Sequence, residues 1–260
     1  MGTLSGKFGI VTAASQGIGL AIARAMASEG CGLIISSSNH GKIEAAAREI
    51  AGESGSAVEP KVFDMQSPES LRDFVSSVKK STKKIDYLVV NFGDPTVAPF
   101  LEISAEDWRK YTNMFLHSSV TLIREFLPLF IDGGSIVFVT SMTTKQAYEG
   151  FSISGSLRAA VVNFAKILSI ELGPRNIRVN CISQGYFMTD RLRKLLEMRS
   201  RRNHTTVEEE KLKIQREIPL GRIGEPSEIG DLVVFLCSPR SSYITGTNIS
   251  IDGGITRYPY

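Results

Sequence analysis

A chain of 260 residues is long enough to bury a substantial core, either as one large α/β domain or as two small ones. Its 42% hydrophobic and 22% charged residues are typical of a soluble globular protein, and a net charge of +3 is too small to indicate nucleic-acid binding. No run of about 18 apolar residues occurs, so we expect no membrane-spanning segment.

The cysteine and histidine patterns indicate neither disulfides nor a metal site. Cys31, Cys181 and Cys237 are far apart and lie in apolar contexts, which predicts buried thiols. The three histidines do not cluster with cysteines or carboxylates, so no metal ligands are predicted. The N-terminal residues lack the pattern of a signal peptide. These features favour the reducing cytoplasm.

Short apolar runs alternate with helical patterns along the whole chain. Strands are expected at residues 8–14, 31–37, 57–64, 85–93, 134–141 and 247–254, with a further strand ending at Asn180. Helices are expected at 19–30, 41–53, from Pro68, at 104–128 and from Ser152. Strands that are apolar on both faces and alternate with helices predict a parallel sheet covered on both sides. We therefore expect a single doubly wound Rossmann domain over 1–260, with a mostly parallel seven-stranded sheet.

Residues 189–219 depart from this alternation, because they are charged and helix-prone and no strand interrupts them. They are interpreted either as a solvated helical pair or as a mobile lid over a pocket. The basic residues among them favour a solvated helix face, although they would also attract an acidic substrate. These residues are Arg191, Arg193, Lys194, Arg199, Arg201 and Arg202.

The first strand runs into a glycine-rich turn, Thr12 to Gly19, at which a helix begins. Backbone N–H groups and the helix dipole at such a turn favour a pyrophosphate. Gly17 and Gly19 permit a close approach of backbone to ligand and of helix to strand. The turn therefore predicts a dinucleotide site.

The turn resembles the Thr-Gly-x-x-x-Gly-x-Gly turn of the short-chain dehydrogenase/reductase family, with Ala13 in place of the first glycine. Further ordered matches cover nearly the whole chain: "VFDMQSPESL", "IDYLVVNFG", "IELGPRNIRVN", "GYFMTD" and "IPLGRIGEPSEIGDLVVFLCSPRSSYITGTNISIDGG". The chain is most similar to the 3-oxoacyl-carrier-protein-reductase type. The resemblance implies a nicotinamide dinucleotide and a homotetramer or homodimer formed through the long helix and the C-terminal segment.

The resemblance also implies which residues contact the dinucleotide. They are Thr12, Ala13, Ser15, Gln16, Gly17, Ile18, Gly19, Ser37, Ser38, Asp64, Met65, Asn91, Phe92, Gly93, Arg158, Gly185, Phe187 and Thr189. The second strand ends in small hydroxyls, without the acidic residue that would select NAD. This pattern favours NADP over NAD, and the approach of Arg24 or Lys42 would strengthen that preference.

The family catalyses its reaction with a serine, a tyrosine, a lysine and an asparagine, and three of these are replaced here. Ser141 matches the serine, whereas Ser154 stands at the tyrosine position and Arg158 at the lysine position. The asparagine position falls on Phe115. An aliphatic hydroxyl is far less acidic than a phenol with a pKa of about 10, so Ser154 is a poor general acid.

Two other phenols, Tyr148 and Tyr186, are candidate acids by location, and packing or substrate contact is the more ordinary role for each. One hypothesis is a divergent NAD(P)-dependent oxidoreductase that transfers hydride between the cofactor and a small carbonyl or alcohol substrate. That substrate would be anionic if Arg158 binds it, because a guanidinium suits carboxylate or phosphate. The alternative is a non-catalytic NAD(P)-binding sensor or assembly protein. Neither hypothesis involves nucleic acid, a membrane or a metal.

Overall fold

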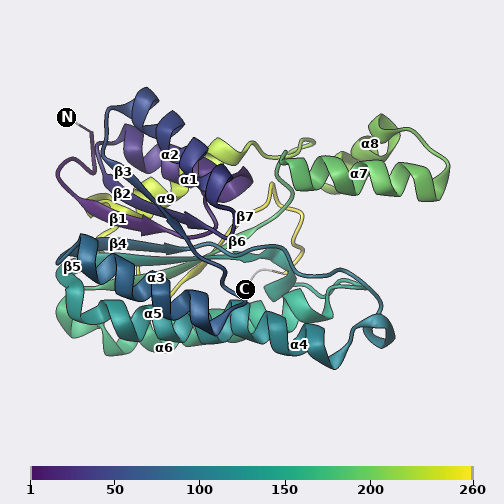
Figure 1. Cartoon of the computed structure of the whole chain (residues 1–260). Coiled ribbons are helices and arrows are strands. Elements are labelled where there is room, and N and C mark those ends of the chain that lie inside the picture. Colours follow the sequence, from purple (N-terminus) through teal and green to yellow (C-terminus); the bar gives the residue numbers. More distant parts are fainter. Residues whose placement is uncertain (1, 259–260) are drawn as a thin grey trace.

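A computed structural model describes residues 2–258, and its centre is a parallel sheet in the order β3-β2-β1-β4-β5-β6-β7 (Figure 1). The seven strands are β1 (Phe8–Val11), β2 (Gly32–Ser37), β3 (Val58–Val62), β4 (Ile85–Val90), β5 (Phe130–Ser141), β6 (Arg178–Gln184) and β7 (Asn248–Ile251). Every neighbouring pair is parallel. The order reverses between β1 and β4, so the predicted doubly wound α/β fold is confirmed.

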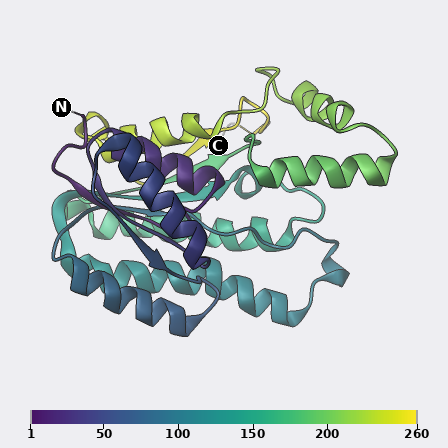
Figure 2. The same ribbon diagram turned by 45° about the horizontal axis from the view of Figure 1, so that its top comes forward.

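Helices cover both faces of the sheet, and both views show the two layers (Figures 1 and 2). The helices are α1 (Gly17–Ser28), α2 (His40–Ser54), α3 (Pro68–Ser81), α4 (Ala105–Thr112), α5 (Ser118–Phe126), α6 (Ser152–Glu171), α7 (Asp190–Asn203), α8 (Val207–Glu217) and α9 (Pro226–Cys237). One face carries α1, α2 and α9, and the other carries α3, α5 and α6.

Each face of the sheet buries its own hydrophobic core. Alternate residues of one strand face opposite sides, so Ile10 of β1 joins the core under α3, α5 and α6 while Val11 joins the core under α1 and α9. The longest helix, α6, has the length and apolar composition of a membrane span. It nevertheless lies along β5 and β6 with polar Ser154 and Arg158 buried, which is the behaviour of a core helix.

The helix expected at 104–128 is interrupted in the structure. A capping box at Ser104 and Asp107 begins α4, and a π-helical turn over Asn113–His117 then separates α4 from α5. The hydroxyls of Ser118 and Ser119 donate to the carbonyls of Met114 and Phe115, which are inside that turn. Such side-chain bonds compete with the regular helical ladder, and the extra residue in the turn changes which side chains face the sheet.

Two helices, α7 and α8, form a hairpin over the segment expected to be helical at 189–219 (Figure 2). A third, smaller apolar cluster packs the hairpin against the rest of the chain. It includes Leu192 and Leu196 of α7, Ile214 of α8, and Met142 beyond the end of β5. The hairpin therefore has a buried underside and is not solvated all round.

The turn between α7 and α8 is organised by one carboxylate. Glu210 is buried and accepts hydrogen bonds from Asn203 Nδ2 at 3.1 Å, Thr205 Oγ1 at 2.7 Å and Lys213 Nζ at 2.6 Å. The hydrogen bond from Lys213, followed by those from Thr205 and Asn203, lowers the pKa of Glu210 from its ordinary 4.5 to about 2. This stabilisation is complete above pH 4.5 and is lost as the pH falls toward 2.

Glu210→Gln should therefore loosen the hairpin, because the neutral amide cannot accept all three bonds. We expect faster hydrogen exchange of backbone amides at 200–213 at pH 7, read by mass spectrometry, with exchange in the sheet unchanged. The control is Glu208→Gln, since Glu208 is exposed and contacts only Lys211 Nζ at 3.4 Å. Equal exchange in both variants would contradict the role given to Glu210.

Candidate active site

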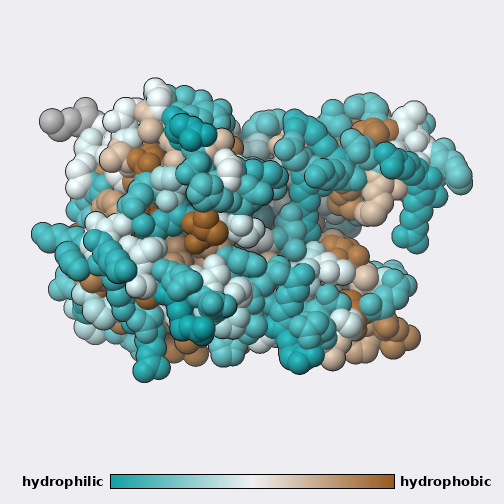
Figure 3. All heavy atoms as spheres, viewed as in Figure 1, coloured by the Kyte–Doolittle hydropathy of each residue, from teal (hydrophilic) through white to brown (hydrophobic). Residues whose placement is uncertain are grey.

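A cavity of about 420 Å³ lies at the carboxyl ends of β1, β4, β5 and β6, where the strand order reverses. Its open side lies between the α7–α8 hairpin and the loop after β4 (Figure 3). Apolar residues are exposed on both of these segments: Val97, Phe100 and Leu101 on the loop, and Met198, Val207 and Leu212 on the hairpin. Of these residues, Val97 lines the cavity itself.

The floor of the cavity is built where β1, β4 and α1 meet. Thr12 Oγ1 donates to the carbonyl of Asn91 at 2.7 Å and accepts from its backbone N–H at 3.0 Å. Asn91 Nδ2 donates to the carbonyl of Ala13 at 3.1 Å. A Cβ on Gly19 would lie 2.1 Å from that carbonyl, so only glycine lets α1 approach this closely. Ala13 itself adopts a positive φ of 49°, at the position where the family has glycine.

The N-terminus of α1 fits the pyrophosphate of a dinucleotide. Gln16 is the N-cap residue, yet its side chain accepts no hydrogen bond from the first turn of the helix. The N–H groups of that turn therefore have no side-chain cap. At the positive end of the helix dipole, they are available to bind an anion. A Cβ on Gly17 would lie 3.5 Å from Thr189 Cγ2, so the turn lies directly beside the start of α7.

At the far end of the cavity, Ser37 ends β2, Ser38 follows it, and Asp64 lies just beyond β3. Lys42, in the first turn of α2, reaches back over this end, with Nζ 3.3 Å from Gln16 Oε1. Arg24 does not approach, because its guanidinium pairs with Glu49 and Glu53. Of the two cations that the sequence leaves open, Lys42 is therefore the one at the adenosine end.

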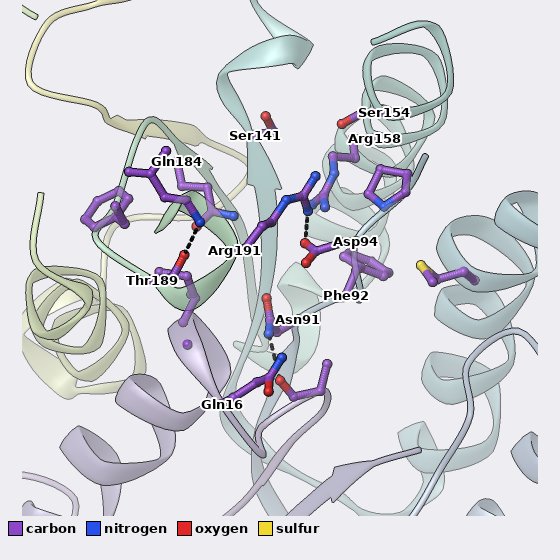
Figure 4. A pocket seen from close by; sticks show the side chains of 18 of the residues that line it. Gln16, Asn91, Phe92, Asp94, Ser141, Ser154, Arg158, Gln184, Thr189 and Arg191 are labelled. Carbon is purple, nitrogen blue, oxygen red and sulfur yellow. Dashed lines mark hydrogen bonds and ion pairs between the residues drawn. The ribbon is translucent and has the colours of Figure 1, made fainter. Parts of the chain in front are cut away.

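Ser141, at the end of β5, lines the cavity (Figure 4). Ser141 Oγ accepts from Thr143 N at 3.2 Å, which orients it, and its own proton remains free for a ligand. Ser154, in the first turn of α6, is buried with its Oγ 3.3 Å from Thr143 Oγ1. Thr143 thus contacts both serines.

Arg158 follows Ser154 by one helical turn and is 5% exposed. Its Nη1 donates to the carbonyl of Val139 at 3.0 Å, whereas its buried Nε has no partner. The guanidinium carbon lies 4.7 Å from the ring centroid of Phe115 and 5.7 Å from that of Phe92. Burial lowers the pKa of Arg158 to about 10, so the group stays charged at neutral pH.

The two candidate phenols occupy different places. Tyr186 lines the cavity, on a segment that hydrogen bonds between Tyr186, Met188 and Gly224 fix to the loop before α9. Tyr148 does not line it; its hydroxyl is 3.7 Å from Met142 Sδ and its ring packs on Phe151. Burial raises the pKa of Tyr148, which makes it a weaker acid. Tyr186 is therefore the better placed of the two.

Of the expected cofactor positions, all but two line the cavity. The exceptions are Thr12 and Gly19, which support the floor. The lining positions are Ala13, Ser15, Gln16, Gly17, Ile18, Ser37, Ser38, Asp64, Met65, Asn91, Phe92, Gly93, Arg158, Gly185, Phe187 and Thr189.

Further polar residues, not expected at the site from the sequence, also line the cavity, among them Asp94, Gln184 and Arg191. Arg191 and Asp94 form an ion pair that joins the start of α7 to the loop after β4 (Figure 4). Burial lowers the pKa of Arg191. Asp94 and Gln184 could have been expected at the site from the sequence, because each lies at or just beyond the carboxyl end of a predicted parallel strand.

Comparisons with known proteins agree on one family. The family model described as Enoyl-(Acyl carrier protein) reductase matches residues 12–256. A 3-oxoacyl-[acyl-carrier-protein] reductase of Aquifex aeolicus is 33% identical, over 97% of this chain and 98% of that protein. Human dehydrogenase/reductase SDR family member 4 is 32% identical, over 96% and 88%. The crystal structure of L-sorbose reductase from Gluconobacter frateurii, complexed with NADPH and L-sorbose, superposes with a TM-score of 0.93, 31% identity and 99% coverage of both chains.

Replacing Arg158 by methionine should stabilise the fold, because the unpaired charge is held away from water. We expect urea unfolding at pH 7 to show a gain of about 1–3 kcal/mol. Arg178→Met is the control: Arg178 is also buried, but it donates to three backbone carbonyls and to the hydroxyl of Ser241. That variant should lose stability, since those acceptors become unpaired. A similar loss in both variants would show that Arg158 is structural.

Proposed function

The chain belongs to the short-chain dehydrogenase/reductase family of NAD(P)-dependent oxidoreductases, and we propose that it interconverts a small carbonyl compound and the corresponding alcohol. The observation that supports this most is the cavity itself, which joins an uncapped helix N-terminus to the free hydroxyl of Ser141. Bound in the cavity, the nicotinamide ring would supply or accept the hydride.

Ser141 is proposed to donate its hydroxyl proton as a hydrogen bond to the substrate carbonyl oxygen. Thr143 N fixes the serine oxygen from behind, at 3.2 Å, so the hydroxyl hydrogen is directed toward the ligand. The proton that the oxygen gains on reduction would come from Tyr186, and solvent would then restore it.

The proposed cofactor is NADP rather than NAD. β2 ends without the carboxylate that would repel an adenosine 2′-phosphate, and Ser37, Ser38 and Lys42 offer two hydroxyls and a cation. The similar L-sorbose reductase is complexed with NADPH.

We also propose that the chain forms a homotetramer or homodimer through α6. Ile167 and Ile170 of this helix are 47% and 70% exposed, and this apolar surface supports such an assembly. Cys31, Cys181 and Cys237 are free and buried, which suits a reducing compartment such as the cytoplasm.

Lys42→Met tests the cofactor preference. It should weaken NADPH binding about tenfold, because one charge-assisted contact is lost, and should leave NADH binding unchanged. Titration of the reduced dinucleotide fluorescence measures both affinities. Arg24→Met is the matched control and should change neither. An equal loss for NADH would mean that Lys42 does not read the 2′-phosphate.

Turnover of a panel of aldehydes and ketones with NADPH tests the reaction. Ser141→Ala should lower kcat by about a hundredfold, as the loss of a preorganised donor to a developing oxyanion does. Tyr186→Phe should also lower kcat, whereas Tyr148→Phe should not. Tight NADPH binding with no turnover of any carbonyl would instead support the alternative of a dinucleotide-binding sensor or assembly protein.

A further inference from the structure

Two buried arginines in this chain, Arg178 and Arg158, differ in how many hydrogen-bond partners they have. Arg178 is 8% exposed, and both of its terminal nitrogens donate to carbonyls at the end of α9, with a further bond to Ser241. Arg158 is 5% exposed, yet among the described residues it has one hydrogen bond and no carboxylate partner. Its Nε is buried without an acceptor. Arg178 has the partners of a structural arginine, and Arg158 lacks them.

The unmet donors of Arg158 belong to a group that lines the cavity (Figure 4). Phe115 and Phe92 cover the guanidinium with their rings, which tolerate a cation but accept no N–H bond in its plane. The neighbouring carboxylate of the cavity, Asp94, is already paired with Arg191. Asp190 also lines the cavity, and it pairs with Arg193. Both of these carboxylates therefore have cation partners, and Arg158 has no negative charge beside it among the described residues.

The position of Arg158 limits where an anionic group of a ligand could lie relative to Ser141. Its Nη1 is anchored on the carbonyl of Val139, which lies two residues before Ser141 on β5. Two residues of a strand span about 7 Å. A ligand whose carbonyl oxygen accepts from Ser141 reaches the guanidinium only with an anionic group one or two carbons away. A carboxylate is planar and matches the guanidinium fork at that separation.

We infer that the substrate is a 2-oxo or 3-oxo acid, or the corresponding hydroxy acid, whose carboxylate pairs with Arg158 while its reacting oxygen contacts Ser141. This inference rests on the proposed function, because it names the substrate class of the same site. It also gives the replacement of the family's lysine by arginine a purpose, since a lysine ammonium cannot form two parallel bonds to a carboxylate.

The test compares two probes that differ in one group, 2-oxopentanoate and 2-pentanone. Each is titrated calorimetrically into the chain alone and into the chain saturated with NADP⁺, in which the oxidised cofactor prevents reduction and only binding is measured. We expect 2-oxopentanoate to bind about tenfold to a hundredfold more tightly than 2-pentanone. Equal affinities for the two probes in both titrations would overturn the inference.

Variants identify the group responsible. Arg158→Met should abolish the preference for 2-oxopentanoate, and Arg158→Lys should retain part of it. Arg72→Met removes a cation from the exposed face of α3, outside the cavity, and should keep the full preference. The NADP⁺ affinity is measured for every variant. If Arg158→Met loses NADP⁺ affinity and keeps the preference, Arg158 holds the ribose and the inference is wrong.

Turnover separates this inference from the proposed function. Reduction of both probes by NADPH with equal KM values would leave the proposed function intact and overturn the oxo-acid assignment. Preferential binding of 2-oxopentanoate without reduction of any carbonyl would overturn the proposed function and leave the carboxylate subsite. A KM for 2-oxopentanoate that is lower in the unchanged chain than in Arg158→Met, with little difference in kcat, supports both.

Discussion

The contact between α1 and the ends of β1 and β4 is the constraint on which the rest of the structure depends. Gly19 has no side chain, and any Cβ there would lie 2.1 Å from the carbonyl of Ala13 and 2.8 Å from Asn91 Nδ2. This absence lets the helix approach the sheet where Thr12 and Asn91 join the two strands. The cavity lies at this joint because the strand order reverses here: the strands that follow β1 are added on one side of it and those that follow β4 on the other.

The positions at which the family has asparagine, tyrosine and lysine hold side chains that are compatible with one another: Phe115, Ser154 and Arg158. Arg158 needs more room than a lysine and a surface that tolerates a planar cation. Phe115 supplies that surface from the neighbouring helix, with its ring 4.7 Å from the guanidinium carbon. Ser154 leaves the space that a phenol would fill and bonds instead to Thr143. Arg158 is thus a fixed positive charge between two aromatic rings.

The α7–α8 hairpin contacts two segments that line the cavity. Its apolar underside packs on Met142, one residue beyond Ser141, so the hairpin and the end of β5 share a boundary. On the other side, Arg191 reaches across to Asp94. Both residues are partly exposed, so this ion pair is worth little energy by itself and weakens with salt. Its main effect is to keep the Asp94 carboxylate occupied and Arg158 without a counter-charge.

The sequence alone determined the alternation of strands and helices, the glycine turn and the family, because these features are local and repeat with fixed periods. It also located Ser154 and Arg158, since the flanking matches leave no gap. It did not reveal the π-helical turn at Asn113–His117, the pairing of Arg191 with Asp94, or the different surroundings of Tyr148 and Tyr186. The ion pair and the surroundings of the two tyrosines depend on which distant residues meet in the folded chain. Only the packed tertiary structure decides this, because neither charge pairing nor burial is fixed by neighbours in the chain.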